Sequence, residues 1–463
     1  MDEITPAGQR DALAQKHCQT LAGRRQRGRR QDARLRLLRL WSQRYPKTPP
    51  AAPPQRVLVI RPDHLGDLLF ATPALHLLRA SLPDAHIAAL VGPWGEAVLA
   101  GNPDLDQILT CPFPGFTRQA KGDLLAPYRL LRGEATRLAD LHFDLALVLR
   151  FDHWWGSWLA AAAGIPQRLG YAVDEVAPFL TRAIPYVRGR HEVVQNLALA
   201  LAAAADSEQL AVNSGQLAAI GEQMAVNSGQ LAVNSDLGSQ VRGVGGRGRG
   251  GTVGDFDSQW RLRFEVSAED EAAAAALLPA GDRPLVAIHP GSGAAVKRWR
   301  SAAWAELATR LAVDLGAQVV FTGSAGEAEL IDPVLALLAA GSSLPARPIS
   351  LAGQTSLGVL AALYRRCALV VGPDSGPLHL AVAVGAPTVH LYGPVDRRTF
   401  GPWGSPQRHA VVTSDWGCIP CNRLDWPAGA LAEHGCVRDI SVEQVLAEAR
   451  RCLLLTSPTS GSV

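Results

Sequence analysis

The fold is decided by the stretch Ala368-Leu369-Val370-Val371-Gly372-Pro373-Asp374-Ser375-Gly376-Pro377-Leu378-His379-Leu380-Ala381. Four apolar residues run into Gly372-Pro373, which ends a strand, and Asp374 or Ser375 can then cap a helix. Pro377 suits the first turn of that helix, where its missing N–H leaves no donor unpaired. The helix N-terminus offers free N–H groups and a positive dipole end, so it can seat a diphosphate. The alternative is an ordinary strand-to-helix turn with a good cap.

The composition is that of a large globular protein. Its 463 residues are too many for one ordinary domain, and a 48% hydrophobic content allows large cores. A net charge of +3 does not suggest a partner among nucleic acids. No run of about 18 apolar residues occurs, and Met1-Asp2-Glu3-Ile4-Thr5 lacks a signal-peptide pattern. We therefore expect a cytoplasmic protein whose seven cysteines are reduced thiols.

Strands alternate with helices over two long regions, which predicts parallel βαβ units and an α/β fold. The first region opens with the apolar strand Arg56 to Arg61, and the second has its first buried strand at Leu285 to Ile288. The predicted division of the chain is a basic, proline-ended extension at 1–54, a first domain at 55–205, a repeat insertion at 206–257, a second domain at 258–455 and a tail at 456–463.

The extension interleaves arginine with leucine between Arg34 and Trp41. A helix here could lie on an anionic membrane surface with Leu35, Leu38 and Trp41 facing inward. The alternative is a solvated, partly disordered tail.

The insertion repeats itself: the segment Ala211 to Ala218 recurs unchanged at Ala225 to Ala232. It is too short and too polar to build a core, so we expect a flexible connection without chemistry.

Four motifs together resemble glycosyltransferase family 9, the bacterial heptosyltransferases of lipopolysaccharide core synthesis. They are Leu65-Gly66-Asp67 with Thr72-Pro73, His289-Pro290-Gly291-Ser292-Gly293 with Lys297-Arg298-Trp299, Thr322-Gly323 with Glu327, and Gly372 to His379. The resemblance implies a GT-B fold, with two Rossmann-like domains that face each other across a cleft. The first domain would bind a glycan or glycolipid acceptor, and the second a nucleotide-sugar donor, ADP-heptose in this family.

Carried over to this chain, the family's catalytic base is Asp67, which would take the proton of the attacking acceptor hydroxyl. A carboxylate at the carboxyl end of a parallel strand suits that role, although Asp67 could instead cap the following helix. Lys297 would neutralise the diphosphate leaving group. No metal-binding constellation stands out, so the resemblance implies an inverting reaction without metal or other cofactor.

The remaining donor-site residues of the resemblance also lie in the second domain. Ser292 and Gly293 would donate to the phosphates, and Glu327 would accept from the ribose. The diphosphate and the donor sugar would be held by Asp374, Ser375, Gly376 and His379. Gly376 allows close approach of a ligand to the backbone, and His379 lies about one helical turn further on.

Three points stay open at this stage. Asp63-His64 stands where small hydroxyl residues are usual in the family, and His64 is either a second acid–base group or an exposed loop residue. Cys418-Ile419-Pro420-Cys421 with His434-Gly435-Cys436 has zinc-ligand residue types, or it is a loop packed with reduced cysteines. The chain could also use another nucleotide sugar, or bind a nucleotide without catalysis. A dehydrogenase is disfavoured, because the first βα turn lacks Gly-x-Gly-x-x-Gly.

Overall fold

The computed structural model describes residues 5–23, 29–47, 53–117, 123, 125–204, 260–341 and 344–456. These residues fall into two compact units. The N-terminal unit contains the described residues from 23 to 204 together with Arg263–Glu265, and the C-terminal unit contains residues 5–22, 260–262 and 266–456. The predicted repeat insertion at 206–257 lies outside the described residues.

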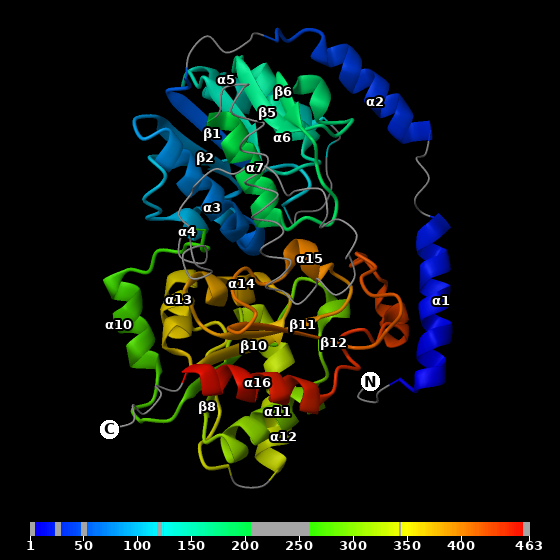
Figure 1. Ribbon diagram of the computed structural model, residues 1–463, viewed down its shortest axis with the longest axis vertical. Helices are drawn as coiled ribbons and strands as arrows, with labels where there is room; N and C mark the ends of the chain where they lie inside the picture. The colour runs from blue at the N-terminus through cyan, green and yellow to red at the C-terminus, as the bar shows by residue number, and fades with distance from the viewer. Residues whose placement is uncertain are drawn as a thin grey trace, which may run out of the picture. The chain divides into compact units, whose positions relative to one another are not determined.

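The N-terminal unit is built on a six-stranded parallel sheet with the order β3-β2-β1-β4-β5-β6 (Figure 1). The order reverses between β1 and β4, and open α/β sheets bind ligands at such a point, outside the carboxyl ends of the strands. Its elements are α2 (Arg29–Ser42), β1 (Arg56–Arg61), α3 (Leu65–Ser81), β2 (His86–Val91), α4 (Glu96–Leu99), β3 (Gln107–Thr110), α5 (Ala126–Ala139), β4 (Leu145–Val148), α6 (Trp154–Ala162), β5 (Gln167–Tyr171), β6 (Arg182–Ile184) and α7 (Glu192–Ala204).

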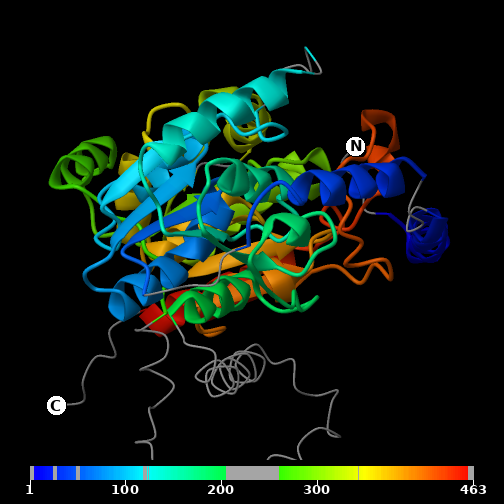
Figure 2. The same ribbon diagram turned by 90° about the horizontal axis from the view of Figure 1, so that it is seen from above.

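Helices cover both faces of this sheet. Helices α5 and α6 pack on one face, and α3 and α7 lie side by side on the other (Figure 2). The four residues Val57 to Ile60 are each at most 2% exposed. A β-branched, continuously apolar run is what a strand buried on both faces requires, so the predicted first strand is confirmed with its limits.

The C-terminal unit repeats this design with the parallel order β12-β11-β10-β7-β8-β9. Helices α11, α12 and α16 share one core with the strands. Its elements are α1 (Ala7–Gly23), α10 (Ala268–Leu277), β7 (Leu285–Ile288), α11 (Ser301–Asp314), β8 (Gln318–Phe321), α12 (Ala328–Ala340), β9 (Ile349–Ser350), α13 (Leu357–Arg366), β10 (Leu369–Pro373), α14 (Gly376–Ala383), β11 (Thr388–Tyr392), α15 (Arg397–Phe400), β12 (His409–Thr413) and α16 (Val442–Thr456). The prediction of an α/β chain with two Rossmann-like domains is thus confirmed.

The described part of the N-terminal extension forms two helices, and α2 uses its apolar face within the protein. Leu38 is 2% exposed in the core of the N-terminal unit, where Trp41 also packs. The Trp41 ring stacks on Trp158 with 5.0 Å between centroids. The expectation that this face enters a membrane needs correction, because folding already buries it. Leu37 and Leu40 remain outside, 50% and 59% exposed.

No helix in the described ranges has both the length and the apolar character needed to span a membrane.

Packing of α2 predicts a large stability difference between neighbouring leucines. Leu38→Ala should lower the free energy of unfolding by about 2–5 kcal/mol, the usual range for emptying a buried leucine site. Leu37→Ala should change it by less than about 0.5 kcal/mol, because that side chain is half in solvent. Urea unfolding of the two variants measures both values. Equal stability of the two would show that α2 does not belong to the core.

Candidate active site

Asp67 lies in the first turn of α3, just past the carboxyl end of β1. The residue at the N-cap of this helix is His64, and no side-chain capping hydrogen bond is formed there. Asp67 therefore does not act as the cap, which was the structural alternative to a catalytic role. His64 is exposed, and its ring lies 5.1 Å from the Trp94 ring, so it packs as a loop residue.

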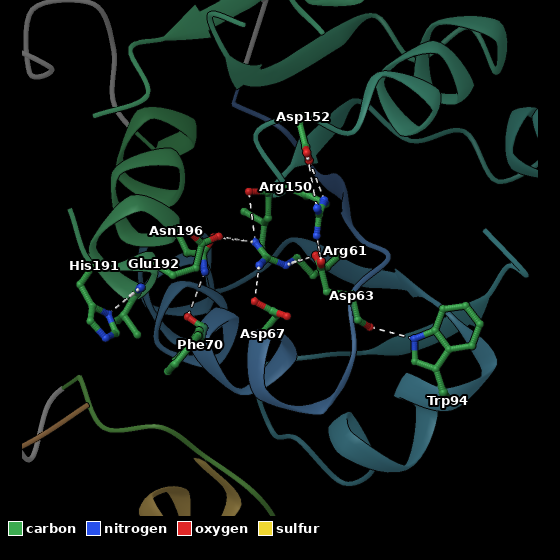
Figure 3. A network of polar contacts seen from close by, with 12 residues as sticks. Arg61, Asp63, Asp67, Phe70, Trp94, Arg150, Asp152, His191, Glu192 and Asn196 are labelled. Carbon is green, nitrogen blue, oxygen red and sulfur yellow. Dashed lines mark hydrogen bonds and ion pairs between the residues drawn. The ribbon is translucent and has the colours of Figure 1, made fainter. Parts of the chain in front are cut away.

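Arg61, the last residue of β1, is the centre of a buried ionic network (Figure 3). Its side chain is only 3% exposed. The guanidinium lies 2.7 Å from a carboxylate oxygen of Asp63 and 2.9 Å from one of Glu192. Its third carboxylate neighbour is Asp67, at 3.5 Å. A buried cation of this kind must be paired, and here it is paired three times.

A second guanidinium, that of Arg150, completes the network, and this residue stands two positions after the end of β4. Arg150 donates to Asp63, and it also donates to Asp152 at 2.6 Å. The main-chain carbonyl of Asp63 accepts a hydrogen bond from the Trp94 indole at 2.9 Å. Asp63 is thus fixed by two arginines and through its backbone, with 2% of its side chain exposed.

The network shifts the pKa values of the Asp67 and Asp63 carboxyls in opposite directions. Burial raises the pKa of Asp67 to about 7, and the negative charges of Asp63 and Glu192 act in the same direction against Arg61. Burial also opposes ionisation of Asp63, but Arg61 and Arg150 hold the pKa of that carboxyl below its usual range. A proton acceptor near neutral pH beside a permanently ionised partner is an arrangement suited to general-base chemistry.

The second group of predicted residues comes together at the carboxyl ends of β7 and β10. Asp374 follows β10, and α14 begins at Gly376 with Ser375 at its N-cap. The Lys297 ammonium lies 3.0 Å from one Asp374 carboxylate oxygen, and the His379 Nε2 lies 3.5 Å from the other. The predicted convergence of these two loops is therefore present in the structure.

The hydroxyl of Ser375 gives the helix N-terminus a free polar group. Within the described residues, its buried Oγ has no hydrogen-bond partner and makes no capping bond. An unpaired buried hydroxyl is costly unless something binds it. Together with the N–H groups of the first turn of α14, this Oγ is available to an anion.

Asp374 holds the cationic side of the site together. Burial works against its ionisation, yet Lys297 and then His379 keep the pKa of this carboxyl well below its ordinary range. A carboxylate cannot itself neutralise a diphosphate. The position of Asp374 between Lys297 and His379 suits a residue that orients these two side chains.

The loop between β7 and Lys297 contains the other predicted phosphate contacts. The Ser292 hydroxyl donates to the Ala294 carbonyl at 2.9 Å, so it stabilises its own loop. A Cβ at Gly293 would have no heavy atom within 4 Å, which leaves its backbone approachable. The predicted contacts of Ser292 and Gly293 with phosphate stay predictions.

Glu327 has a structural role at the start of α12. One carboxylate oxygen accepts from the Ser324 N–H at 2.7 Å and from its hydroxyl at 2.8 Å, which is a capping box. The other oxygen lies so near Gly291 that a Cβ there would be 1.9 Å away. A side chain at 291 would therefore have to displace the Glu327 carboxylate, and the predicted ribose contact could use only this second oxygen.

The predicted cysteine loop meets helix α1. A small cavity is lined by His17, Cys418, Cys421, His434 and Cys436 among other residues. Burial raises the pKa of Cys418 to about 11 and lowers the pKa of His434 to about 4, so the thiol is protonated and the imidazole neutral at pH 7. In the described part of the chain, no three His, Cys, Asp or Glu side chains are arranged to hold a metal ion.

Sequence reasoning singled out Asp67 but not the residues that control it. Glu192 and Arg61 are 131 positions apart, and Arg150 comes from a third segment. The available signal was that each of two apolar strands ends at a charge or within two residues of one: Arg61 is the last residue of β1, and Arg150 stands two residues after β4. Two cations at the carboxyl edge of one sheet need carboxylates, and Asp63 was the nearest in sequence.

A family model described as glycosyltransferase family 9 (heptosyltransferase) matches residues 254–428. Lipopolysaccharide heptosyltransferase 2 of Escherichia coli K12 is 25% identical over 417 residues, which cover 86% of this chain and 99% of the relative. Lipopolysaccharide heptosyltransferase 1 of Pseudomonas aeruginosa is 34% identical over 166 residues, or 36% of this chain and 44% of that protein.

Solved structures agree with the fold. The E. coli ADP-heptose lps heptosyltransferase II structure has a TM-score of 0.61 at 23% identity and covers 87% of this chain and 100% of its own. The glycosyl transferase family 9 structure from Veillonella parvula has a TM-score of 0.62 at 23% identity, with 87% and 98% covered. The predicted GT-B fold class is confirmed. The family match over residues 254–428 and the relatives aligned over nearly their full length agree with the predicted resemblance to glycosyltransferase family 9, and they confirm the predicted class of enzyme, a glycosyltransferase.

Proposed function

We propose that this protein transfers heptose from ADP-heptose to a lipopolysaccharide-like glycan acceptor, in an inverting reaction that requires no metal ion. The acceptor class follows relatives that are named as lipopolysaccharide heptosyltransferases. The donor follows the E. coli structure that is named as an ADP-heptose lps heptosyltransferase. The observation that supports catalysis best is Asp67, a partly buried carboxylate, 34% exposed, with a pKa of about 7 in the first turn of α3.

In the proposed reaction, Asp67 is the general base. It takes the proton of an acceptor hydroxyl while that oxygen attacks the anomeric carbon of the donor. The bond from this carbon to the diphosphate oxygen breaks, and the nucleoside diphosphate leaves with the electron pair. A single displacement of this kind inverts the anomeric configuration.

The leaving diphosphate would be stabilised by groups of the C-terminal unit. Lys297 supplies a full positive charge, and the first turn of α14 supplies N–H groups and the positive end of a helix dipole. The unpartnered hydroxyl of Ser375 adds a donor at the same place. This set of fixed cationic and dipolar groups can do the work of a metal ion at a developing negative charge.

The direct test is transfer by the full-length protein in excess chelator, with a panel of nucleotide sugars and a heptose-acceptor glycan. We expect product from ADP-heptose, with the anomeric configuration inverted by NMR. Product only after addition of magnesium would contradict metal independence. Preference for a different nucleotide sugar would replace the donor assignment, and binding of donors without turnover would favour the non-catalytic alternative.

We also propose that the protein acts in the cytoplasm against the inner face of the membrane, where a lipid-linked acceptor is presented. The outward side of α2 suits such contact, since Leu37 and Leu40 are exposed beside the exposed Arg36.

The membrane proposal predicts that the double substitution Leu37→Glu with Leu40→Glu weakens binding to anionic vesicles and spares turnover of a soluble acceptor. The loss should be largest at low salt, because the two new carboxylates repel the anionic surface and salt screens this repulsion. Vesicle co-sedimentation measures it. If the double variant binds the vesicles as tightly as wild type, α2 does not contact the membrane.

A further inference from the structure

The ionic network around Asp67 contains more negative than positive groups. Three carboxyls, those of Asp63, Asp67 and Glu192, surround the Arg61 guanidinium. The second guanidinium, that of Arg150, is shared between Asp63 and a fourth carboxyl, Asp152. At least one of the three carboxyls around Arg61 must therefore carry excess negative charge or bind a proton.

The geometry decides which carboxyl is left over. Asp63 and Glu192 are 2% and 4% exposed and lie within 2.9 Å of Arg61. Asp67 is 34% exposed and lies 3.5 Å from the same guanidinium. Of the three carboxyls around Arg61, Asp67 is the farthest from the guanidinium and the most exposed to solvent. It is therefore the carboxyl that exchanges protons.

Glu192 holds Arg61 from the side of α7. It stands in the first turn of this helix, where the dipole favours a negative charge. One turn later, the Asn196 side-chain oxygen accepts from Arg61 at 3.3 Å, and its nitrogen donates to the Phe70 carbonyl at 3.1 Å. Helix α7 is thereby fixed to both Arg61 and α3, as Figure 3 shows. The other titratable groups that sense Glu192 are Tyr171 and Tyr186.

We propose that Glu192 is a positioning residue for glycosyl transfer: it occupies the Arg61 guanidinium so that this cation cannot neutralise the base Asp67. The inference rests on the proposed role of Asp67. Glu192 touches neither reacting atom, and it acts entirely through Arg61 and through its own charge. Without that charge, Arg61 would shift its pairing toward Asp67 and make it a weaker base.

The test is the pH dependence of kcat/KM in the full-length protein carrying Glu192→Gln. Glutamine keeps an oxygen to accept from Arg61 but removes the charge. The acid limb of the profile reports the base of the free enzyme. We expect this limb to move about one pH unit lower, with a lower plateau and unchanged KM for the donor. Glu192→Asp should return the limb toward its wild-type position.

The matched control is Glu134→Gln. Glu134 is also ion-paired with an arginine of the N-terminal unit, Arg137 on the same helix, but it does not act on Asp67. Its profile should match wild type. A Glu192→Gln limb that coincides with this control would overturn the inference.

If Glu192→Gln does not fold, a second variant tests the inference, and it should shift the acid limb in the opposite direction. Asn196→Asp adds a negative charge beside Arg61, so the acid limb should move to higher pH. An unmoved limb in this variant also counts against the inference. If Asp67→Asn retains turnover, the proposed base itself is wrong. If Asp67→Asn is inactive while both limbs stay in place, only the role of Glu192 fails.

Discussion

Replacement of Asp67 by asparagine should abolish glycosyl transfer and leave donor binding nearly unchanged. Loss of a general base costs about 100- to 10,000-fold in rate, and the amide cannot take the acceptor proton. The donor contacts that we propose lie in the C-terminal unit, on Lys297 and α14. Initial rates and calorimetry with a nucleoside diphosphate measure the two effects separately.

Wild-type activity should also have an acid limb set by this group. The active form of the base is the carboxylate, so kcat/KM should fall about tenfold per pH unit below the pKa of about 7. Glu134→Gln is the control for a paired carboxylate of the same unit, because Glu134 pairs with Arg137 and does not act on Asp67. Wild-type rates in Asp67→Asn would end the assignment.

Stability gives an independent check on the same variant. The folded-state pKa of Asp67 lies above that of an aspartate in an unfolded chain, about 3.9. Ionisation of Asp67 therefore disfavours the folded state, and this cost grows as pH rises from about 4 through 7. Asp67→Asn should consequently melt no lower than wild type at pH 8. Inactivity without loss of stability separates a chemical role from a folding defect.

The fold was predictable because its signals are local. The buried strands at Val57 to Ile60 and at Leu369 to Val371 are continuous apolar runs, and each ends at a turn residue or a charge. Parallel sheets bury such strands on both faces, so the pattern has one plausible interpretation. The positions of Asp67 and Lys297 after the carboxyl ends of their strands were predictable for a related reason, since each lies within a short motif whose residues are neighbours in sequence.

The residues that tune the site were not predictable in this way. Glu192 reads as an ordinary acidic residue in the first turn of a helix, and only the packing of α7 against α3 brings it to Arg61. A similar limit applies to α2. Its pattern of leucine and arginine requires an apolar partner for Leu38, but the pattern cannot say whether this partner is lipid or the tryptophans of the same chain.

Lys297→Ala should weaken binding of a nucleoside diphosphate and reduce turnover more strongly. A hydrogen bond to a charged group contributes about 1.5–3 kcal/mol to binding. The charge on the leaving oxygen grows in the transition state, so the effect on rate should be about 100- to 1,000-fold, as for loss of an oxyanion-stabilising donor. Calorimetry in chelator and initial rates give the two numbers for the full-length protein.

The control is Arg310→Ala, which removes a cation from the surface of α11, where it pairs with Asp314. This variant should bind and turn over as wild type, because its charge is exposed and screened. If Lys297→Ala binds nucleoside diphosphate as tightly as this control, the ammonium is not in the donor site.

Asp374→Asn should shift binding in the opposite direction. The carboxylate now shares the Lys297 ammonium at 3.0 Å and lies 3.5 Å from His379, so its negative charge opposes an incoming diphosphate. Asparagine removes this repulsion and frees the ammonium, and nucleoside diphosphate should bind more tightly by calorimetry. Turnover should still fall, because the lysine loses the partner that orients it toward the leaving group. Weaker binding in Asp374→Asn would mean that the carboxylate contacts the donor favourably, and that Lys297 needs this ion pair in order to bind the diphosphate at all.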